Sequence, residues 1–371
     1  MAQAWLVYRL SQSPFLLGLV AFAGQLPTLF LGLHAGVVAD RFSRYRVVLV
    51  TQVLAMLQAL ILGVLTLSGA ITVWQVFVLA LVAGALQTFE MPARQSFLQE
   101  IVGREDLTSA IALNSALVNG ARIIGPALAG ILVAQVGEGA CFSLNALCYL
   151  GIIGGFLAMR LPSESPRKPA TASTSAFIRE GVTYALRTPA IRLLLVLIGL
   201  LSLLGTPHTV LMPVFAEEVL RSGASGMGLL MGAAGTGAVV GTIFLAGHRG
   251  TDKLGRVIVI AFVLFGLGLV LFSLSRHLWL SLLLLPLVGS GFMVPMSATN
   301  TLLQTLTPDH LRGRVMSLFL IMFMGTPPLG SLLAGSLAPH IGAPLTVGIT
   351  GLCCLGGAVW FASRLSLLQE S

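Results

Sequence analysis

The sequence predicts an all-α membrane protein with many crossings, and three observations agree on this. Only 9% of its 371 residues are charged and 56% are hydrophobic, whereas soluble domains are about 25% charged. The mean hydropathy is +0.95. Uncharged runs of about 20 residues, long enough for a helix to cross the hydrocarbon core, follow one another along the chain. A soluble core cannot bury so much apolar surface, so these runs are predicted to be transmembrane helices.

Eleven full crossings are expected, each an apolar run bounded by a short polar or basic loop. They begin near Pro14, Val47, Ile71, Ile111, Cys141, Leu193, Met227, Val257, Leu278, Val315 and Leu345. The first ten residues, MAQAWLVYRL, are about half a crossing long, and their order does not match a signal peptide. Two explanations stay open for this half crossing: a twelve-crossing protein that lacks the first part of its first helix, and a start placed at an internal codon.

The basic residues predict the orientation. When alternate loops are assigned to alternate sides, 17 of the 21 Lys and Arg residues lie on one side and 3 on the other. The positive-inside rule makes the richer side, which includes the C-terminus, cytoplasmic. The net charge of +8 follows from these short loops, so we do not expect a nucleic-acid partner. The four cysteines lie in apolar runs and are expected to act as small hydrophobic residues, not metal ligands.

An internal repeat predicts two halves. Three glycines recur at one constant offset, as the pairs Gly125 and Gly330, Gly130 and Gly335, and Gly137 and Gly342. We expect residues 1–160 and 193–371 to form two parallel, pseudo-symmetric transmembrane halves with a substrate site between them. Residues 161–192 between them are expected to be a cytoplasmic linker, first rich in Pro, Ser and Thr and then an amphipathic helix.

The stretch GVVADRFSRYR, between the first two full crossings, resembles a loop motif of the major facilitator superfamily. The residues that match are Gly36, Asp40, Arg41, Arg44 and Arg46. The resemblance implies that the aspartate meets the start of the helix that begins near Leu311, whose N-terminus carries about half a positive charge. Such a contact would latch the cytoplasmic ends of the two halves. The alternative is that the arginines of this motif only follow the positive-inside rule.

The stretch from Met91 to Gly130 is similar to the branch of that superfamily with enterobactin exporter-like and macrolide-efflux-like permeases. Within it, Gly125, Pro126 and Gly130 resemble the antiporter motif of the fifth helix. The resemblance implies a major facilitator fold in the cytoplasmic membrane of a bacterium. It also implies export of a drug-like compound or siderophore by a cofactor-free monomer, through alternating access, with protons as the driving ion.

Arg122 is the most informative single residue, because it lies about halfway along an apolar run. A charge at that depth is costly, by about 2.5 kcal/mol or more, unless it faces a polar cavity or a partner. Gln25, halfway along its own span, is one available partner. Two roles stay open for Arg122: binding of an anionic substrate group or a proton relay, and a buried structural clamp.

Other candidate residues follow from position. Glu90 is the only acid that we place within reach of a span, with proton coupling and an interfacial salt bridge as alternatives. His208 and Asn300 lie in or beside helix-breaking stretches and are cavity candidates. The breaks are expected at GTPHTVLMP, GSGFMVPMSATN and GTPP, and the glycines of GMGLLMGAAGTGAVVG are expected to pack against other helices.

The sequence contains no phosphate-binding loop for ATP and no cluster of catalytic residues, so we do not expect an enzyme. A secondary exporter is the first hypothesis. The second is a channel or a non-transporting membrane receptor on the same fold. Channels are commonly built around rings of identical groups, which a chain with two halves and one mid-span arginine does not supply.

Overall fold

The predicted apolar runs form helices in the structure, a computed structural model that describes residues 1–159, 174–247 and 253–368. The N-terminal half contains α1 (Ala2–Ser11), α2 (Pro14–Arg41), α3 (Arg44–Leu67), α4 (Val73–Ile101) and α5 (Gly103–Ala158). Local chemistry sets these starts. Pro14 occupies the first turn of α2 behind the Ser13 cap, and Thr72 and Gln75 form a reciprocal capping box at the start of α4.

The C-terminal half follows the short helix α6 (Thr174–Arg187). Its elements are α7 (Pro189–Val210), α8 (Met212–Val214), a π-helical turn (Phe215–Val219), α9 (Gly223–Ala246), α10 (Leu254–Leu274), α11 (Leu278–Leu306), α12 (Asp309–Gly325), α13 (Pro327–Ile341), α14 (Ala343–Ala362) and a final 3-10 turn (Leu365–Leu368). Residues 160–173, which include the first part of the predicted linker, lie outside the described residues.

The number of crossings agrees with the sequence prediction. The described residues form ten apolar helical stretches long enough to cross a membrane. One of them belongs to α5, which has 56 residues and would be about 84 Å long if it were straight. Gly137 interrupts it with φ 79° and ψ 170°, so α5 supplies two crossings and the total is eleven.

Two of the three predicted helix breaks are present. The chain leaves α7 at Val210 and passes through α8 and a π-helical turn, and α12 ends at Gly325 before α13 starts at Pro327. The third expected break is wrong, because α11 is one helix from Leu278 to Leu306 with Pro286 and Pro295 inside it. Membrane helices tolerate such prolines where neighbouring helices and local adjustments satisfy the freed backbone groups.

The repeat is visible in the backbone. Gly137 and Gly342, one of the repeated pairs, have φ values of 79° and 83°. Each joins two successive crossings, Gly137 within α5 and Gly342 between α13 and α14. Positive φ at both sites explains why glycine occupies both.

The two halves meet through small residues. A Cβ atom added to Gly130 of α5 would lie 2.8 Å from the Cα of Gly228 in α9. A Cβ atom added to Gly18 of α2 would lie 2.7 Å from the Cα of Gly335 in α13. These glycines let helices of opposite halves approach at backbone distance. The glycine-rich α9 therefore packs as its spacing predicts.

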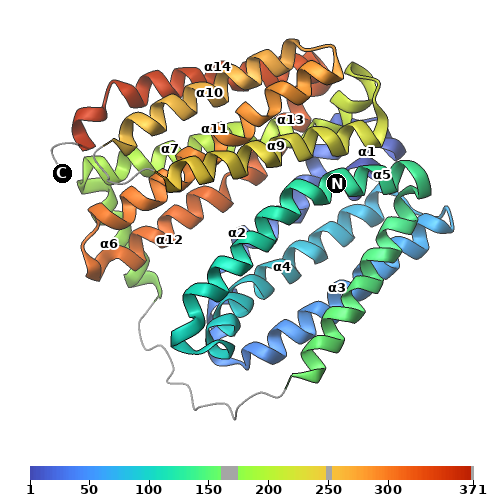
Figure 1. The fold of residues 1–371 in the computed structure, drawn as a ribbon, viewed down its shortest axis with the longest axis horizontal. Helices are drawn as coiled ribbons and strands as arrows, with labels where there is room; N and C mark the ends of the chain where they lie inside the picture. Colours follow the sequence, from blue (N-terminus) through green and yellow to red (C-terminus); the bar gives the residue numbers. More distant parts are fainter. Residues whose placement is uncertain (160–173, 248–252, 369–371) are drawn as a thin grey trace.

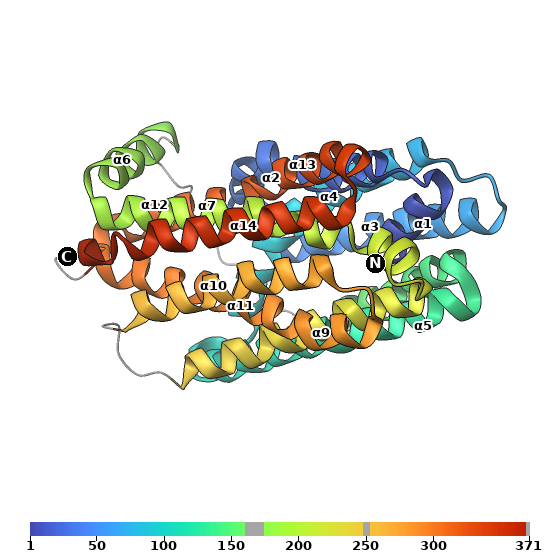
Figure 2. The same ribbon diagram turned by 90° about the horizontal axis from the view of Figure 1, so that it is seen from above.

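The bundles converge at one end, which we call the outer end; it holds α1, the start of α2 and Gly137. Figure 1 shows the two bundles close together near α1 and diverging toward α6 and the last turn of α5. Figure 2 shows α6 and the C-terminus at the opposite end of the molecule from α1. The contacts between the two halves that are described above thus lie toward the outer end.

Candidate functional site

A cavity of about 400 Å³ lies between the halves. Four helices supply its walls: α1, α2 and α4 from the N-terminal half and the end of α7 from the C-terminal half. The helices α2 and α4 approach closely because glycines face each other. A Cβ atom added to Gly84 would lie 2.0 Å from the carbonyl oxygen of Gly24. The cavity therefore has a rigid wall on the N-terminal side.

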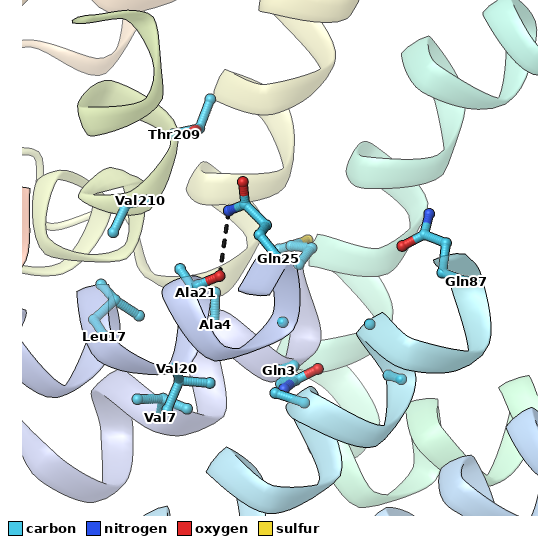
Figure 3. A pocket seen from close by; sticks show the side chains of 15 residues that line it. Gln3, Ala4, Val7, Leu17, Val20, Ala21, Gln25, Gln87, Thr209 and Val210 are labelled. Carbon is cyan, nitrogen blue, oxygen red and sulfur yellow. Dashed lines mark hydrogen bonds between the residues drawn. The ribbon is translucent and has the colours of Figure 1, made fainter. Parts of the chain in front are cut away.

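The polar side chains that line the cavity carry amides and a hydroxyl. Gln3, Gln25 and Gln87 come from three different helices, and Thr209 comes from α7 (Figure 3). Gln25, a cavity candidate from the sequence, is one of the lining residues. Its amide nitrogen donates to the carbonyl of Ala21 at 3.2 Å. None of the described residues that line the cavity has an ionisable side chain.

Side-chain contacts across the two halves close the outer end. Gln25 donates to the hydroxyl of Ser331 in α13 at 3.3 Å. Nearer the outer end, the Tyr8 hydroxyl donates to the carboxylate of Glu218 in the π-helical turn. Tyr8 is only 1% exposed, so α1 is fixed against the C-terminal half by a buried ring and a charge-assisted hydrogen bond.

A second ionic contact holds α1 to its own half. The guanidinium of Arg9 lies 2.7 Å from Glu138, which directly follows the kink at Gly137. Glu138 is buried, at 6% exposure. The attraction of the arginine offsets part of the cost of removing this carboxylate from water. Arg9 and Glu138 therefore place the end of α1 over the junction between the two crossings of α5.

The structure places Arg122 at the interface between the halves. Its carbonyl oxygen lies 2.6 Å from a Cβ atom added to Gly235 of α9. Its side chain is exposed, and it makes no hydrogen bond or ion pair within the part of the chain that the structure describes. Gln25, the partner suggested by sequence, bonds Ala21 and Ser331 instead.

The helical phase of α5 gives the direction of Arg122. Leu117, Ile124 and Leu128 are all more than half exposed and share one face of the helix. Arg122 is two residues before Ile124, which is about 200° around the helix axis. It therefore lies on a different face of α5 from these three apolar side chains. Its depth is about 22 Å below Gly137, and Gln87 is about 21 Å below the start of α4 at Val73, so the two lie at similar depth.

The antiporter-like motif of α5 has a packing surface and an open surface. The carbonyl of Pro126 lies 2.5 Å from a Cβ atom added to Gly228, and Gly130 is buried against the same glycine. Gly125 has open space around its Cα, with nothing within 4 Å of an added Cβ. The motif thus packs α5 on α9 along one face, and Arg122 lies beside the open face.

His208 and Asn300 do not line the cavity. His208 is 6% exposed, its Nδ1 atom bonds the carbonyl of Gly205, and its ring meets Phe265 edge to face at 6.1 Å. It belongs to the aromatic core of the C-terminal half. Asn300 is half-buried on α11 and accepts a hydrogen bond from Gln304.

Glu90 has two partners on the N-terminal half. Gln52 of α3 donates to its carboxylate at 3.1 Å, and Arg94 lies 3.4 Å away, one turn further along α4. These are the contacts expected of a salt bridge near a helix end.

The loop motif lies at the joint between α2 and α3. The helix α2 ends at Arg41 and α3 begins at Arg44; Gly36, Asp40 and Arg41 are helical, and their side chains lie outside the described residues. Arg44 donates to the carbonyl of Ser96 at 3.3 Å and lies 3.4 Å from Glu100, which ties the motif to α4. Arg46 is exposed in the first turn of α3.

Comparison with known proteins identifies the family. The sequence profile of the transmembrane secretion effector family matches residues 1–370. The chain belongs to this family, which is part of the major facilitator superfamily.

Characterised relatives of this family member cover almost its whole length. It is 27% identical to the staphyloferrin A transporter of Staphylococcus aureus, over 99% of this chain and 93% of that one. It is 28% identical to the multidrug efflux pump Tap of Mycolicibacterium fortuitum, over 98% and 91%. The identity to the enterobactin exporter EntS of Salmonella choleraesuis is 27%, over 87% and 77%.

Solved structures confirm the major facilitator fold. The crystal structure of the nucleoside transporter NupG is similar with a TM-score of 0.74 and 13% identity, over 99% of this chain and 94% of that one. A POT family transporter in complex with 5-aminolevulinic acid gives a TM-score of 0.76 at 13% identity, over 99% and 93%. At these identities the likeness concerns the fold alone.

Several polar groups of this transporter differ from the sequence prediction. The expectation that Glu90 is the only acid within reach of a span is wrong, because Glu138 and Glu218 lie within the apolar stretches of α5 and of α7 with its following turns. Glu138 follows the repeated Gly137, so the repeat itself signals a junction there. No sequence signal pairs Tyr8 with Glu218, which lies far along the chain.

Proposed function

We propose that this transporter is a secondary active exporter that moves a small molecule out across the cytoplasmic membrane of a bacterium. It works by alternating access, and protons supply the driving force. The cavity between the halves carries this proposal. It is lined by both halves and closed toward the outer end by Gln25 with Ser331 and by Tyr8 with Glu218. A site between two halves that is closed at one end is what one state of alternating access requires.

The relatives support the direction and the cargo. A siderophore transporter, a multidrug efflux pump and a siderophore exporter each match this chain over most of their length. The orientation in this proposal is the one that the basic loops predict, with the C-terminus in the cytoplasm. The outer end then faces away from the cytoplasm, and the described state is inward-facing.

The chemistry of the cavity favours a ligand rich in hydrogen-bond acceptors. A volume of about 400 Å³ falls in the usual range for small-molecule sites. Three amides offer donors and acceptors at once. Arg122 does not line the described cavity, but at the depth of Gln87 and without a partner among the described residues it offers one fixed positive charge at the interface between the halves. A drug-like compound or siderophore with an anionic or phenolic group fits this arrangement.

Counterflow tests the carrier mechanism against the channel or receptor alternative. Proteoliposomes loaded with unlabelled compound should transiently accumulate labelled compound, because a carrier exchanges and a pore does not. Staphyloferrin A, enterobactin and ethidium are suitable probes. Ala83→Trp, which fills the cavity, should abolish the exchange, whereas Ala134→Trp at an exposed position on α5 should not. Downhill leak without counterflow for the transported probe would overturn the proposal.

Glu90 tests the coupling ion. If Glu90 carries the proton, Glu90→Gln should abolish export driven by a pH gradient in inverted vesicles and leave counterflow intact, because exchange needs no net proton movement. If Glu90 only bridges to Gln52 and Arg94, both activities and the melting temperature should fall together. Driven export that equals wild type would remove Glu90 from the coupling mechanism.

Arg122 tests substrate recognition. Arg122→Gln should keep expression and melting near normal and abolish export, because the side chain is exposed and bonds no described residue. Arg122→Lys should keep part of the activity, because the charge remains and the planar fork is lost. Lower melting in both variants, before any transport defect, would support the structural clamp instead. Full transport with unchanged melting would exclude both roles.

A further inference from the structure

A second, smaller pocket lies far from the cavity, where the first turns of α7 meet the last turns of α14. Its volume is about 70 Å³. One wall consists of Pro189, Arg192, Leu193 and Val196 of α7, and the other of Trp360, Arg364 and Leu367. The α7 residues are spaced by three, four and seven residues, which places them on one helix face, whereas the other wall combines Trp360 of α14 with Arg364 and Leu367 from the turns that follow it. One helix face and the end of α14 with its following turns therefore form one slot.

Two arginines stand at the rim of this slot, and both are exposed. The guanidinium carbon of Arg364 lies 5.4 Å from the centre of the Trp360 ring. Arg192 donates one hydrogen bond, to the carbonyl of Leu186 at 3.5 Å. In the described parts of the chain neither arginine pairs with a carboxylate. A guanidinium has five N–H donors, so most of the donors here have no protein acceptor.

The base of the slot is apolar, and exposed apolar side chains line or adjoin it. Val196, one turn beyond Arg192, is 41% exposed, and Val359, beside Trp360, is 69% exposed. In the orientation of the proposed function, α7 begins and α14 ends on the cytoplasmic side. Tryptophan and arginine at that level are typical of the membrane interface. A charged rim above an apolar slot matches a lipid headgroup above its acyl chain.

We propose that this pocket binds an anionic phospholipid of the cytoplasmic leaflet. The phosphate bridges Arg192 and Arg364, and an acyl chain lies along Val196. Basic pockets between membrane helices on this side bind anionic headgroups such as cardiolipin. The positive-inside rule alone explains why the two arginines are cytoplasmic. It does not explain why two segments that are distant in the sequence bring them to one apolar slot with no acid among the described residues paired to either.

The expected effect is measurable. Each arginine near an anionic surface contributes about fivefold in affinity, so removing both should weaken lipid binding by about 25-fold. Replacement by lysine should lose less, because the charge stays and only the bidentate geometry is lost. The binding should be specific to anionic lipid, since a zwitterionic headgroup brings its own cation.

The experiment uses the full purified chain in detergent. Native mass spectrometry and melting temperature are followed as cardiolipin, phosphatidylglycerol or phosphatidylcholine is added. The variants are Arg192→Gln with Arg364→Gln, the same pair changed to lysine, and Arg187→Gln as a matched control at an exposed position of α6. The first should lose anionic-lipid adducts by about 25-fold and show no thermal stabilisation by cardiolipin. The control should behave as wild type.

Several results would overturn the proposal. One is cardiolipin binding by the double glutamine variant that equals wild type. Another is a loss of binding in Arg187→Gln as large as in the double variant. The third is displacement of the lipid by inorganic phosphate at the same concentration, which would indicate a site for a free anion. If the glutamine pair does not fold, the lysine pair is used in its place. Equal affinity of the wild-type protein for phosphatidylcholine and for cardiolipin would then refute the site. Lipid binding is read without transport, so a failure of counterflow leaves this result unaffected.

Discussion

Gly18 offers the sharpest test of how the halves move. A Cβ atom added there would lie 2.5 Å from the carbonyl oxygen of Ser331 and 2.7 Å and 2.9 Å from the Cα and nitrogen of Gly335. All three atoms are backbone atoms, which cannot turn away as a flexible side chain does. Gly18→Ala therefore forces α2 and α13 apart at the outer end. It acts on a contact that exists only while that end is closed.

The expected shift in the population of the two states follows from the cost of overpacking. Added methyl groups in a tight site cost about 1 to 3 kcal/mol, which corresponds to a shift of about fivefold to 150-fold between two states. The gain in helix propensity from glycine to alanine, about 1 kcal/mol, applies to both states and cancels in their ratio. Gly18→Ala should therefore populate the outward-open state at least fivefold more than wild type.

The assay is labelling of a cysteine at Thr209, a cavity position, in a chain whose four natural cysteines are replaced. A membrane-impermeant maleimide added outside should react at least fivefold faster in Gly18→Ala. Gly32→Ala on the same helix is the matched control, because an added Cβ there meets nothing within 4 Å. Equal labelling rates in the two folded variants would refute the reasoning that the Gly18 contact closes the outer end.

Three further predictions concern the outer contact, the cytoplasmic latch and the orientation. Tyr8→Phe removes the hydrogen bond to Glu218, worth about 1.5 to 3 kcal/mol to a charged acceptor. The same labelling from outside should rise, and an unchanged rate would show that the contact does not gate the cavity. If Asp40 meets the start of α12 as the motif resemblance implies, Asp40→Asn should increase cytoplasmic labelling of the cavity by removing a contact of about 0.3 to 2 kcal/mol; no increase would count against the latch. A cysteine at Ser222 should react only from outside and one at Ser363 only from the cytoplasm, and the reverse pattern would invert the orientation.

Sequence alone predicted the fold because the bilayer restricts the choice. Apolar runs of fixed length, with basic residues in alternate loops, leave little freedom in the number of crossings. The break before Pro327 was predictable, since proline cannot continue a helix without losing a hydrogen bond. The continuity of α11 through Pro295 was not, because the cost of an internal proline depends on neighbouring helices that only the tertiary structure supplies.

The residues of the candidate site also differ in whether the sequence alone could indicate them. Gln25 was found because a polar side chain halfway along an apolar span needs a partner or a cavity. His208 satisfied the same rule but is bonded to the backbone of its own helix, at Gly205. Gln3, Gln87 and Thr209 carry no distinguishing pattern, because only the packing of α1, α4 and α7 brings them to one cavity.

The internal repeat links the sequence most directly to the proposed mechanism. Gly130 and Gly335 are equivalent positions of the two halves, and the glycines that they contact, Gly228 and Gly18, are separated by nearly the same offset. The two outer contacts between the halves, α5 with α9 and α13 with α2, are therefore equivalent under the pseudo-symmetry. Opening the outer end must break both, so the penalties of Gly18→Ala and Gly130→Ala should act on the same equilibrium. If they add, the double variant multiplies the two shifts in outside labelling; labelling no faster than that of either single variant would mean that one contact opens without the other.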